Sequence, residues 1–218
     1  MWIDQFLYRG DGAGGTLAPF AQAISAADLL AEVAKDRGTL SRTDYETVRS
    51  LQYQAVLLAD LARRLESDFT RDAHTAERAV RMSVLTDADV SYRAKTLMSA
   101  FTGAIEAFAN LAEVCQALVT VAEGLTVITR PKRRIELVAA VEALRAAAGT
   151  SIVSVALNMG RITDAVVYDR LAAVLGTVDE TLANADRVSA AIRRSAMPTS
   201  GVPAQRLDPS DQIHQLIG

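Results

Sequence analysis

The chain has 218 residues, half of them hydrophobic and 5% aromatic, with a formal net charge of −3 at pH 7 and a pI of about 5.5. This charge gives no reason to expect a nucleic acid as partner, and a single cysteine, Cys115, excludes an internal disulfide. One free thiol fits a reducing, cytoplasmic environment. The first residues lack the basic start and apolar run of a signal peptide. The longest apolar stretch is short for a membrane span, so we expect a soluble protein without a membrane partner.

A glycine-rich segment, "GDGAGGT" at residues 10–16, precedes an alanine-rich stretch. We expect a loop that ends at Thr16, a good N-cap, and a helix from there to about Lys35. A helix start with little side-chain cover offers unpaired N–H groups and the positive end of the dipole to an anion or a carbonyl. Small residues also simply permit a tight turn and close packing, so the pattern alone leaves both interpretations open.

Long amphipathic stretches fill the middle of the chain. Ser41 begins a helix whose apolar positions keep one side as far as Leu65. The pattern weakens around His74, where we expect a break. Thr86 starts the next helix, which continues to about Gly124.

The last third predicts three more helices, at residues 132–149, at residues 150–160, and from Thr163 or Asp164 to Arg194. Apolar residues at three-four spacing in the last helix require another helix, of the same chain or of a second copy. Residues 196–218 hold three prolines and few apolar anchors and predict a mobile tail. Nothing alternates like a strand, so we expect one all-α domain at residues 1–195.

The residues show no catalytic constellation on their own. His74 and His214 are far apart in the sequence, and no metal-ligand spacing is present, so we expect no metal. No motif marks a nucleophile. What remains is the glycine-rich helix entrance and a set of carboxylates within helices: Asp28, Asp68, Glu106 and Glu136. The polar stripe that contains Asp28 is either a solvated surface or the wall of a pocket.

Two distant stretches together resemble one family. "GAGGTLAPFAQAISAADLLAEVA" resembles the glycine-rich opening and alanine-rich helix of the C-terminal domain of formiminotransferase-cyclodeaminase and of the related bacterial methenyltetrahydrofolate cyclohydrolases. "SIVSVALNMGRITDAVVYDRL" resembles a later segment of the same family, and the likeness runs from about Trp2 to Arg194. It implies a bundle of long helices, usually a homodimer, that binds a tetrahydrofolate derivative as substrate with no tightly bound cofactor.

The resemblance also implies site residues. Asp68 falls where the family has an acidic residue, and Glu136 falls where it has a serine-aspartate pair. The residues implied in ligand binding are Gly12, Gly14, Gly15, Thr16, Asn158 and Asp164. For Asn158 and Asp164 a backbone or capping role is the alternative. This chain departs from the family pattern at Ala13, at Asp28 and in the stretch after Asp68.

The implied chemistry makes or opens the one-carbon bridge between N5 and N10 of a reduced folate, as a cyclohydrolase or a cyclodeaminase does. A methenyl carbon is already electrophilic, so acid-base catalysis by carboxylates such as Asp28, Asp68, Glu106 or Glu136 suffices. Two alternatives stay open. The same fold could catalyse a cyclisation or elimination on another small molecule in specialised metabolism, or it could be a non-catalytic binding module.

Overall fold

The computed structural model describes residues 13–36 and 41–196, with side chains described only between residues 17 and 195. The helices are α2 (Ala13–Lys35), α3 (Arg42–Arg81), α4 (Asp87–Thr126), α5 (Arg134–Asn158), α6 (Ala165–Gly176) and α7 (Val178–Ala196), with 3-10 turns η1 (Pro131–Arg133) and η2 (Met159–Arg161). The predicted all-α class is confirmed, and the described ranges contain no strand. Almost all of the predicted tail lies outside the described residues.

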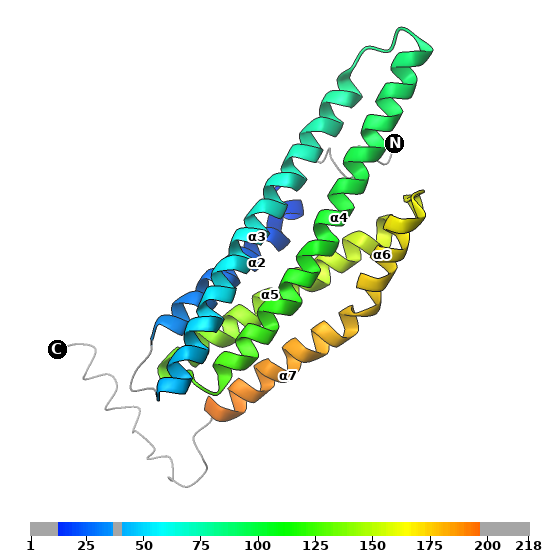
Figure 1. Ribbon diagram of the computed structural model, residues 1–218. Coiled ribbons are helices and arrows are strands. Elements are labelled where there is room, and N and C mark those ends of the chain that lie inside the picture. Colours follow the sequence, from blue (N-terminus) through cyan, green and yellow to red (C-terminus); the bar gives the residue numbers. More distant parts are fainter. Residues whose placement is uncertain (1–12, 37–40, 197–218) are drawn as a thin grey trace, which may run out of the picture.

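Four helices form the bundle (Figure 1). α3 and α4 pack against each other, α2 packs on α3 and α5, and α4 packs on α5. α7 covers α5 and α4 from the outside, while α6 lies across α4 and α5. The end of α3 and the beginning of α4 project beyond the other helices as a two-helix arm, whose tip is the connection at residues 82–86. α2 begins beside the middle part of α3, below the arm (Figure 1).

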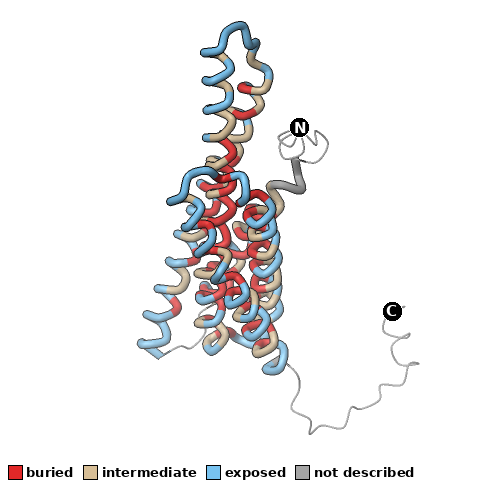
Figure 2. Tube along the Cα trace, turned by 90° about the vertical axis from the view of Figure 1, so that its right-hand side faces the viewer, coloured by how far each residue is buried: buried red, intermediate tan, exposed pale blue. Residues whose placement is uncertain are grey.

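The core joins helices from distant parts of the sequence through a small aromatic cluster. The rings of Phe20, Phe69 and Phe108 come from α2, α3 and α4, and their centroids lie 5.2 to 5.5 Å apart. All three side chains are buried. Alanines such as Ala23, Ala27 and Ala62 surround the rings and let the helix backbones approach closely. Buried residues line the inside of the bundle along most of its length, and the arm is largely exposed (Figure 2).

Two predicted helix breaks are absent. α3 continues without interruption through His74 to Arg81, because Phe69, Ala76 and Ala79 keep its inner side buried while only its outer side turns polar. α5 likewise continues through Gly149 and Thr150 to Asn158, so that the two helices predicted at residues 132–160 are one. A glycine inside a helix lowers its stability without ending it when the neighbouring turns are packed.

One predicted helix is instead two. The chain breaks between α6 and α7 at Thr177, whose hydroxyl donates to the carbonyl of Val174 at 3.0 Å. The apolar spacing continues across the break, because Val174 and Val178 are both buried. The predicted seam of the last helix faces α5 and α4 of the same chain, and Ala185, Val188 and Ile192 are buried there.

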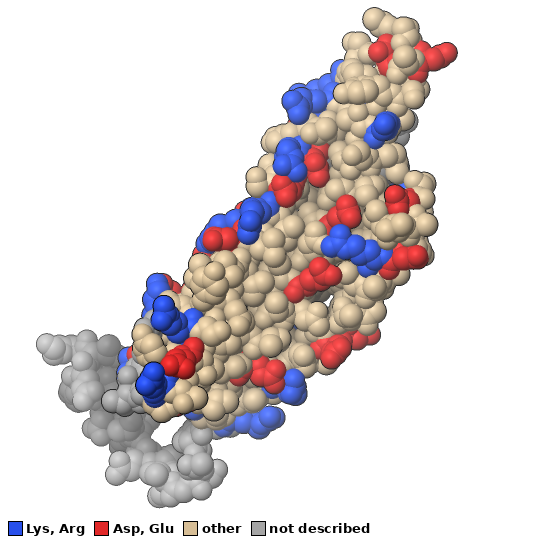
Figure 3. All heavy atoms as spheres, viewed as in Figure 1, with Lys and Arg blue, Asp and Glu red and all other residues tan. Residues whose placement is uncertain are grey.

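Ion pairs tie the lower end of the bundle together. Asp36, after α2, forms ion pairs with Lys132 of η1 at 3.1 Å and with Arg130, just before η1, at 3.2 Å. The hydrogen bond from Lys132 holds the pKa of Asp36 below its usual value. On the face in Figure 3, Lys and Arg side chains alternate with Asp and Glu rather than forming a field of one sign. The basic cluster at residues 130–134 is thus largely used in contacts between helices.

Three helical segments are long and apolar enough to cross a membrane by length and composition: Leu17–Lys35, Asp87–Thr126 and Pro131–Arg161. The sequence-based criterion of an uninterrupted apolar run missed them because a few charged residues interrupt each one. In their most apolar windows, 50%, 67% and 39% of the residues are buried inside the protein, so packing accounts for much of this apolar surface. The cytoplasmic location and the absence of a membrane partner stay predictions.

Candidate functional site

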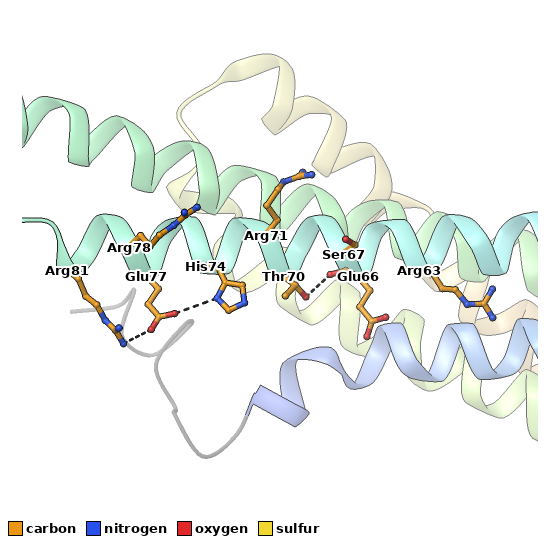
Figure 4. Close-up of a pocket in the computed structure, with 9 residues that line it drawn as sticks. All are labelled: Arg63, Glu66, Ser67, Thr70, Arg71, His74, Glu77, Arg78 and Arg81. Atoms are coloured by element: carbon orange, nitrogen blue, oxygen red, sulfur yellow. Dashed lines mark hydrogen bonds and ion pairs between the residues drawn. The ribbon is translucent and has the colours of Figure 1, made fainter.

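A polar groove of about 790 Å³ runs along the outer side of α3, from the body of the bundle toward the arm (Figure 4). Its described lining comes entirely from α3: Arg63, Glu66, Ser67, Thr70, Arg71, His74, Glu77, Arg78 and Arg81. These residues recur three and four positions apart, which places them on one side of a helix. Leu65 and Phe69, between them in sequence, point into the core. α3 therefore presents apolar side chains inward and a continuous row of hydrogen-bonding groups outward.

The groove has two ends that differ in how their charges are paired. At the Arg63 end, the guanidinium donates to both carboxylate oxygens of Asp28 on α2, at 2.7 and 2.8 Å, and to Asp60 at 3.0 Å. The hydrogen bond with Asp28 raises the pKa of Arg63 above its usual value. These bonds join α2 to α3 and hold Arg63 in one place at the edge of the groove.

At the Arg81 end, Glu77 is shared between two partners. Its carboxylate lies 3.6 Å from Nδ1 of His74 and forms an ion pair with Arg81 at 2.5 Å. Midway along the groove, the Thr70 hydroxyl donates to the carbonyl of Glu66 at 2.8 Å. The groove therefore offers hydroxyl, carboxylate, imidazole and guanidinium groups within a few turns of one helix, a set suited to binding a polar molecule and to moving protons.

The first turn of α2 begins beside this groove (Figure 4). Gly14, Gly15 and Thr16 lie within that turn, so the predicted loop as far as Thr16 is wrong and the helix starts at Ala13. Gly12 lies outside the described residues. The backbone N–H groups of a first helical turn have no partner within the helix, so the positive end of α2 points toward this region. The predicted anion-binding or carbonyl-binding role of these residues stays a prediction.

The four predicted catalytic carboxylates do not come together. Asp28 reaches the groove through Arg63, and Asp68 lies beside the groove with its carboxylate 2.9 Å from Arg71. Glu106 is on α4 under α6, where it pairs with Arg170 at 3.3 Å. Glu136 is near the start of α5, where Arg133 donates to it at 2.7 Å. The structure thus places two of these residues next to the groove and two at other sites.

The two residues of the "NMGRITD" match are held in local hydrogen bonds. Asp164 is the N-cap of α6 and accepts from the backbone N–H groups of Val166 and Val167 at 2.9 and 3.1 Å. Asn158, nearly buried at the end of α5, donates to the carbonyl of Ser154 at 2.8 Å and accepts from Arg161 at 3.3 Å. Both side chains have the local role that the sequence offered as the alternative to ligand binding.

Another carboxylate, Asp72, was not predicted from the sequence. Its Oδ2 lies 2.3 Å from the position that a Cβ on Gly103 of α4 would take, so any other residue at 103 would require the Asp72 side chain to move. Burial raises the pKa of Asp72, opposed by Arg71 and reinforced by Asp68. The feature that marks Asp72 is its position opposite a glycine on the facing helix. The sequence alone does not show this feature, because it depends on how α3 and α4 are aligned.

No group of three or more His, Cys, Asp or Glu side chains that could hold a metal ion occurs among the residues searched, which are those that the structure describes.

The fold and the groove define an all-helical bundle protein with a polar site on one long helix beside a helix N-terminus. The family model described as formiminotransferase-cyclodeaminase matches residues 11–211, and the chain belongs to this family. The fold is similar to the crystal structure of formiminotetrahydrofolate cyclodeaminase from Thermotoga maritima, with a TM-score of 0.71 and 14% sequence identity, over 90% of this chain and 96% of that one. No curated protein sequence matches the chain significantly.

Proposed function

We propose that the groove on α3 binds a reduced folate and that the protein is an enzyme acting on the one-carbon bridge between N5 and N10. The observation that carries this proposal is the family match over residues 11–211, which includes both α3 and the first turn of α2 beside the groove. The structural neighbour, a formiminotetrahydrofolate cyclodeaminase, supports the same class of substrate.

The reaction requires acid-base groups near a cationic carbon. In hydrolysis, water adds to the methenyl carbon and gives one proton to a base; the remaining hydroxyl proton is lost and N5 takes up a proton as the C–N5 bond breaks, which leaves the formyl group on N10. In cyclodeamination, N10 adds to the formimino carbon and loses its proton to a base; the bond from that carbon to the formimino nitrogen then breaks as the nitrogen takes a proton from an acid and leaves as ammonia. Neither step needs a metal or a covalent nucleophile, and we propose that no tightly bound cofactor takes part.

Among the groove residues, we propose His74 and Glu77 as the pair that exchanges the proton. His74 Nδ1 and a carboxylate oxygen of Glu77 are 3.6 Å apart, and both side chains line the groove (Figure 4). A carboxylate near the methenyl cation would stabilise it. Asp28 and Asp68 hold Arg63 and Arg71 at the groove edge, whereas a catalytic role for Glu106 or Glu136 would require a different binding site.

The test is direct. Mixing the protein with 5,10-methenyltetrahydrofolate should speed the loss of its near-ultraviolet absorbance, or 5-formiminotetrahydrofolate should release ammonia faster than in buffer. His74→Gln and Glu77→Gln should lower kcat more than they raise KM, while Asp169→Asn, on the exposed side of α6, should change neither. No acceleration of either reaction over buffer would refute the folate proposal.

A second candidate is the same fold acting on another small molecule. Asp28 favours this candidate. It places a carboxylate in a helix that usually has small, apolar residues in the family that the sequence resembles, and it fixes Arg63 at the groove. Under this candidate, folates should not raise the melting temperature, because only a ligand of the native state does so. A folate that raises the melting temperature without turnover would instead indicate a non-catalytic binding module.

We also propose that the protein is a homodimer formed through α5. The seam on α7 is buried within the chain, but the outer side of α5 is exposed and uncharged at Ile135, Ala139, Ala146, Val153 and Leu157. Ile135 and Leu157 are each 76% exposed.

The spacing of this surface is symmetric about Ala146. Ile135 and Leu157 lie equally far on either side of it, and so do Ala139 and Val153. An antiparallel pair of α5 helices related by a two-fold axis at Ala146 would therefore match large residues at both ends, with small ones where the backbones cross. This self-complementarity is the reason for choosing a second copy as the occupant.

A further inference from the structure

α6 is held to the bundle less firmly than the helix that follows it. Only Leu171 and Val174 of its 12 residues are buried, and Val166 is 80% exposed. Burial of apolar side chains supplies most of the stability of a packed helix, so an element with few of them separates from the rest at low cost. In Figure 1, α6 lies at the outer edge of the molecule.

α7, in contrast, is fastened along its whole length. Val178, at its beginning, and Ile192, near its end, are both buried. The Ser189 hydroxyl donates to Glu142 of α5 at 2.6 Å, and Arg187 forms an ion pair with Glu123 of α4 at 3.3 Å. The break between α6 and α7 therefore separates a loosely packed helix from a firmly packed one.

One arginine joins the middle of α6 to α4 by polar contacts. Arg170 donates to Glu106 at 3.3 Å and to the side-chain oxygen of Asn110, and a carboxylate oxygen of Glu113 lies 4.0 Å from it. These three partners are spread over two turns of α4, so a single side chain ties the two helices together. The guanidinium is exposed, and exposed ion pairs break at low cost.

The backbone can change direction at both ends of α6. Residues 162–164, which precede it, are not helical, and Thr177 interrupts the helical path after it. A Cβ added to Gly176, the last residue of α6, would meet no atom within 4 Å, so packing does not block rotation there. Glycine also has the widest backbone freedom, which suits a hinge.

A small cavity lies beneath the junction of α6 and α7. Its volume is about 10 Å³, and its lining includes Val174 and Thr177 together with Ala112 of α4 and Ile152 of α5. A void removes contacts that would otherwise hold the side chains around it. The inner side of α6 is therefore incompletely packed at the end where it meets α7.

We propose that α6 is a lid that opens by rotation at residues 162–164 and at Thr177, with Arg170 as its latch. The structure shows the lid closed. Opening separates the Arg170 guanidinium from Glu106 and exposes the sides of α4 and α5 on which α6 packs. The lid does not depend on the proposed function, because the residues that define it lie outside the groove on α3.

The test measures how often the lid opens, with a thiol placed beneath it. Ala112→Cys puts this thiol beside the cavity, and the buried Cys115 of the same helix is the internal reference. The full chain is treated with a thiol reagent in native buffer and analysed by peptide mass spectrometry. Position 112 should react at least about tenfold faster than Cys115, because a local opening is more frequent than global unfolding.

Three further substitutions, each combined with Ala112→Cys, identify the part that moves. Arg170→Gln should speed labelling of position 112 about three- to tenfold, because the latch is lost. Gly176→Ala should slow it about two- to fivefold, since alanine fits the closed state and restricts the hinge. The matched control Arg187→Gln, which removes an arginine between α7 and α4, should leave the rate unchanged.

Two results would overturn the lid. One is labelling of position 112 no faster than that of Cys115, and the other is an increase with Arg187→Gln but none with Arg170→Gln, which would show that α7 moves instead. Unchanged labelling of Cys115 in each variant excludes global destabilisation as the cause. If Ala112→Cys does not fold, Val174→Cys, a small change on the α6 side of the same cavity, takes its place.

Discussion

Cys115 lies in α4 with its thiol fully buried, and burial raises its pKa to about 12. Thiolate is the reactive form, so at pH 8 the folded protein should react with a thiol reagent only as fast as it unfolds. We expect negligible labelling in buffer and complete labelling in guanidinium chloride, measured by mass spectrometry. Rapid labelling of the folded protein would mean that the interior of α4 is accessible.

Asp72 gives a prediction about pH, because its carboxylate is partly buried where α3 faces Gly103 of α4. Its pKa is raised in the folded state, so its contribution to stability is present below the unfolded value of 3.8 and is lost as the pH rises through the folded pKa. Asp72→Asn, which has no charge to desolvate, should therefore gain melting temperature relative to the native protein as the pH rises from 4 to 7.

The control for this measurement is Asp169→Asn, an exposed change on α6. Its difference from the native protein should stay constant across the same pH range. If Asp72→Asn and Asp169→Asn behave alike, the carboxylate of Asp72 is as well hydrated in the folded state as in the unfolded state.

At the scale of single residues, the sequence singled out only part of the candidate site. Asp28 and Asp68 were singled out, and both prove to hold arginines at the groove edge. Ser67, Thr70 and His74 were missed because polar residues on an amphipathic helix are usually solvated, and nothing in one helix reveals that a second helix begins beside them. The recurrence of a hydroxyl and an imidazole at three-four spacing was the available signal.

Among the elements, α4 has the best-defined beginning. The Thr86 hydroxyl accepts from the backbone N–H of Asp89 at 3.2 Å, and the Asp89 carboxylate accepts from the backbone N–H of Thr86 at 2.9 Å. The Thr86 hydroxyl also donates to the Asp89 carboxylate at 2.9 Å. This bond, together with those from the backbone N–H groups of Leu85 and Thr86, holds the pKa of Asp89 below its usual value. Thr86→Ala should cost about 1 kcal/mol of stability.

That loss corresponds to a fall in melting temperature of about 2 to 4 °C in a protein of this size. Differential scanning calorimetry measures it, with Ser91→Ala, exposed one turn further along α4, as the matched control. An equal effect of both substitutions would show that hydroxyl loss in general, rather than the cap, is responsible.

Helix identity was predictable from periodicity, and helix boundaries were not. The break predicted at His74 is absent. Around this residue α3 keeps only a few apolar positions, on its inner side, and so many polar residues in sequence resemble a loop. The break at Thr177 was hidden for the reverse reason, since apolar residues continue at helical spacing on both sides of it. Sequence periodicity reports which side of a segment is buried, and a change of direction between two buried segments leaves no trace in it.

For the whole molecule, the α5 surface makes a prediction about assembly. Ala146→Arg places a charge at the centre of the proposed two-fold contact and should convert the dimer to a monomer, measured by light scattering. Leu57→Arg puts the same charge on another exposed apolar position, on α3, and should leave the dimer intact. Dissociation by Leu57→Arg alone would move the interface to α3, and a monomeric native protein would refute the dimer.

The long hairpin of α3 and α4 has a consequence for how the chain reaches this structure. Among the described helices, these two share the most extensive contact, yet only residues 82–86 separate them. Closing so short a connection costs little conformational entropy, so this pairing can form early and at low kinetic cost. α2 and α5 pack against each other although the whole hairpin lies between them in sequence. They can then assemble on a template that already carries the groove.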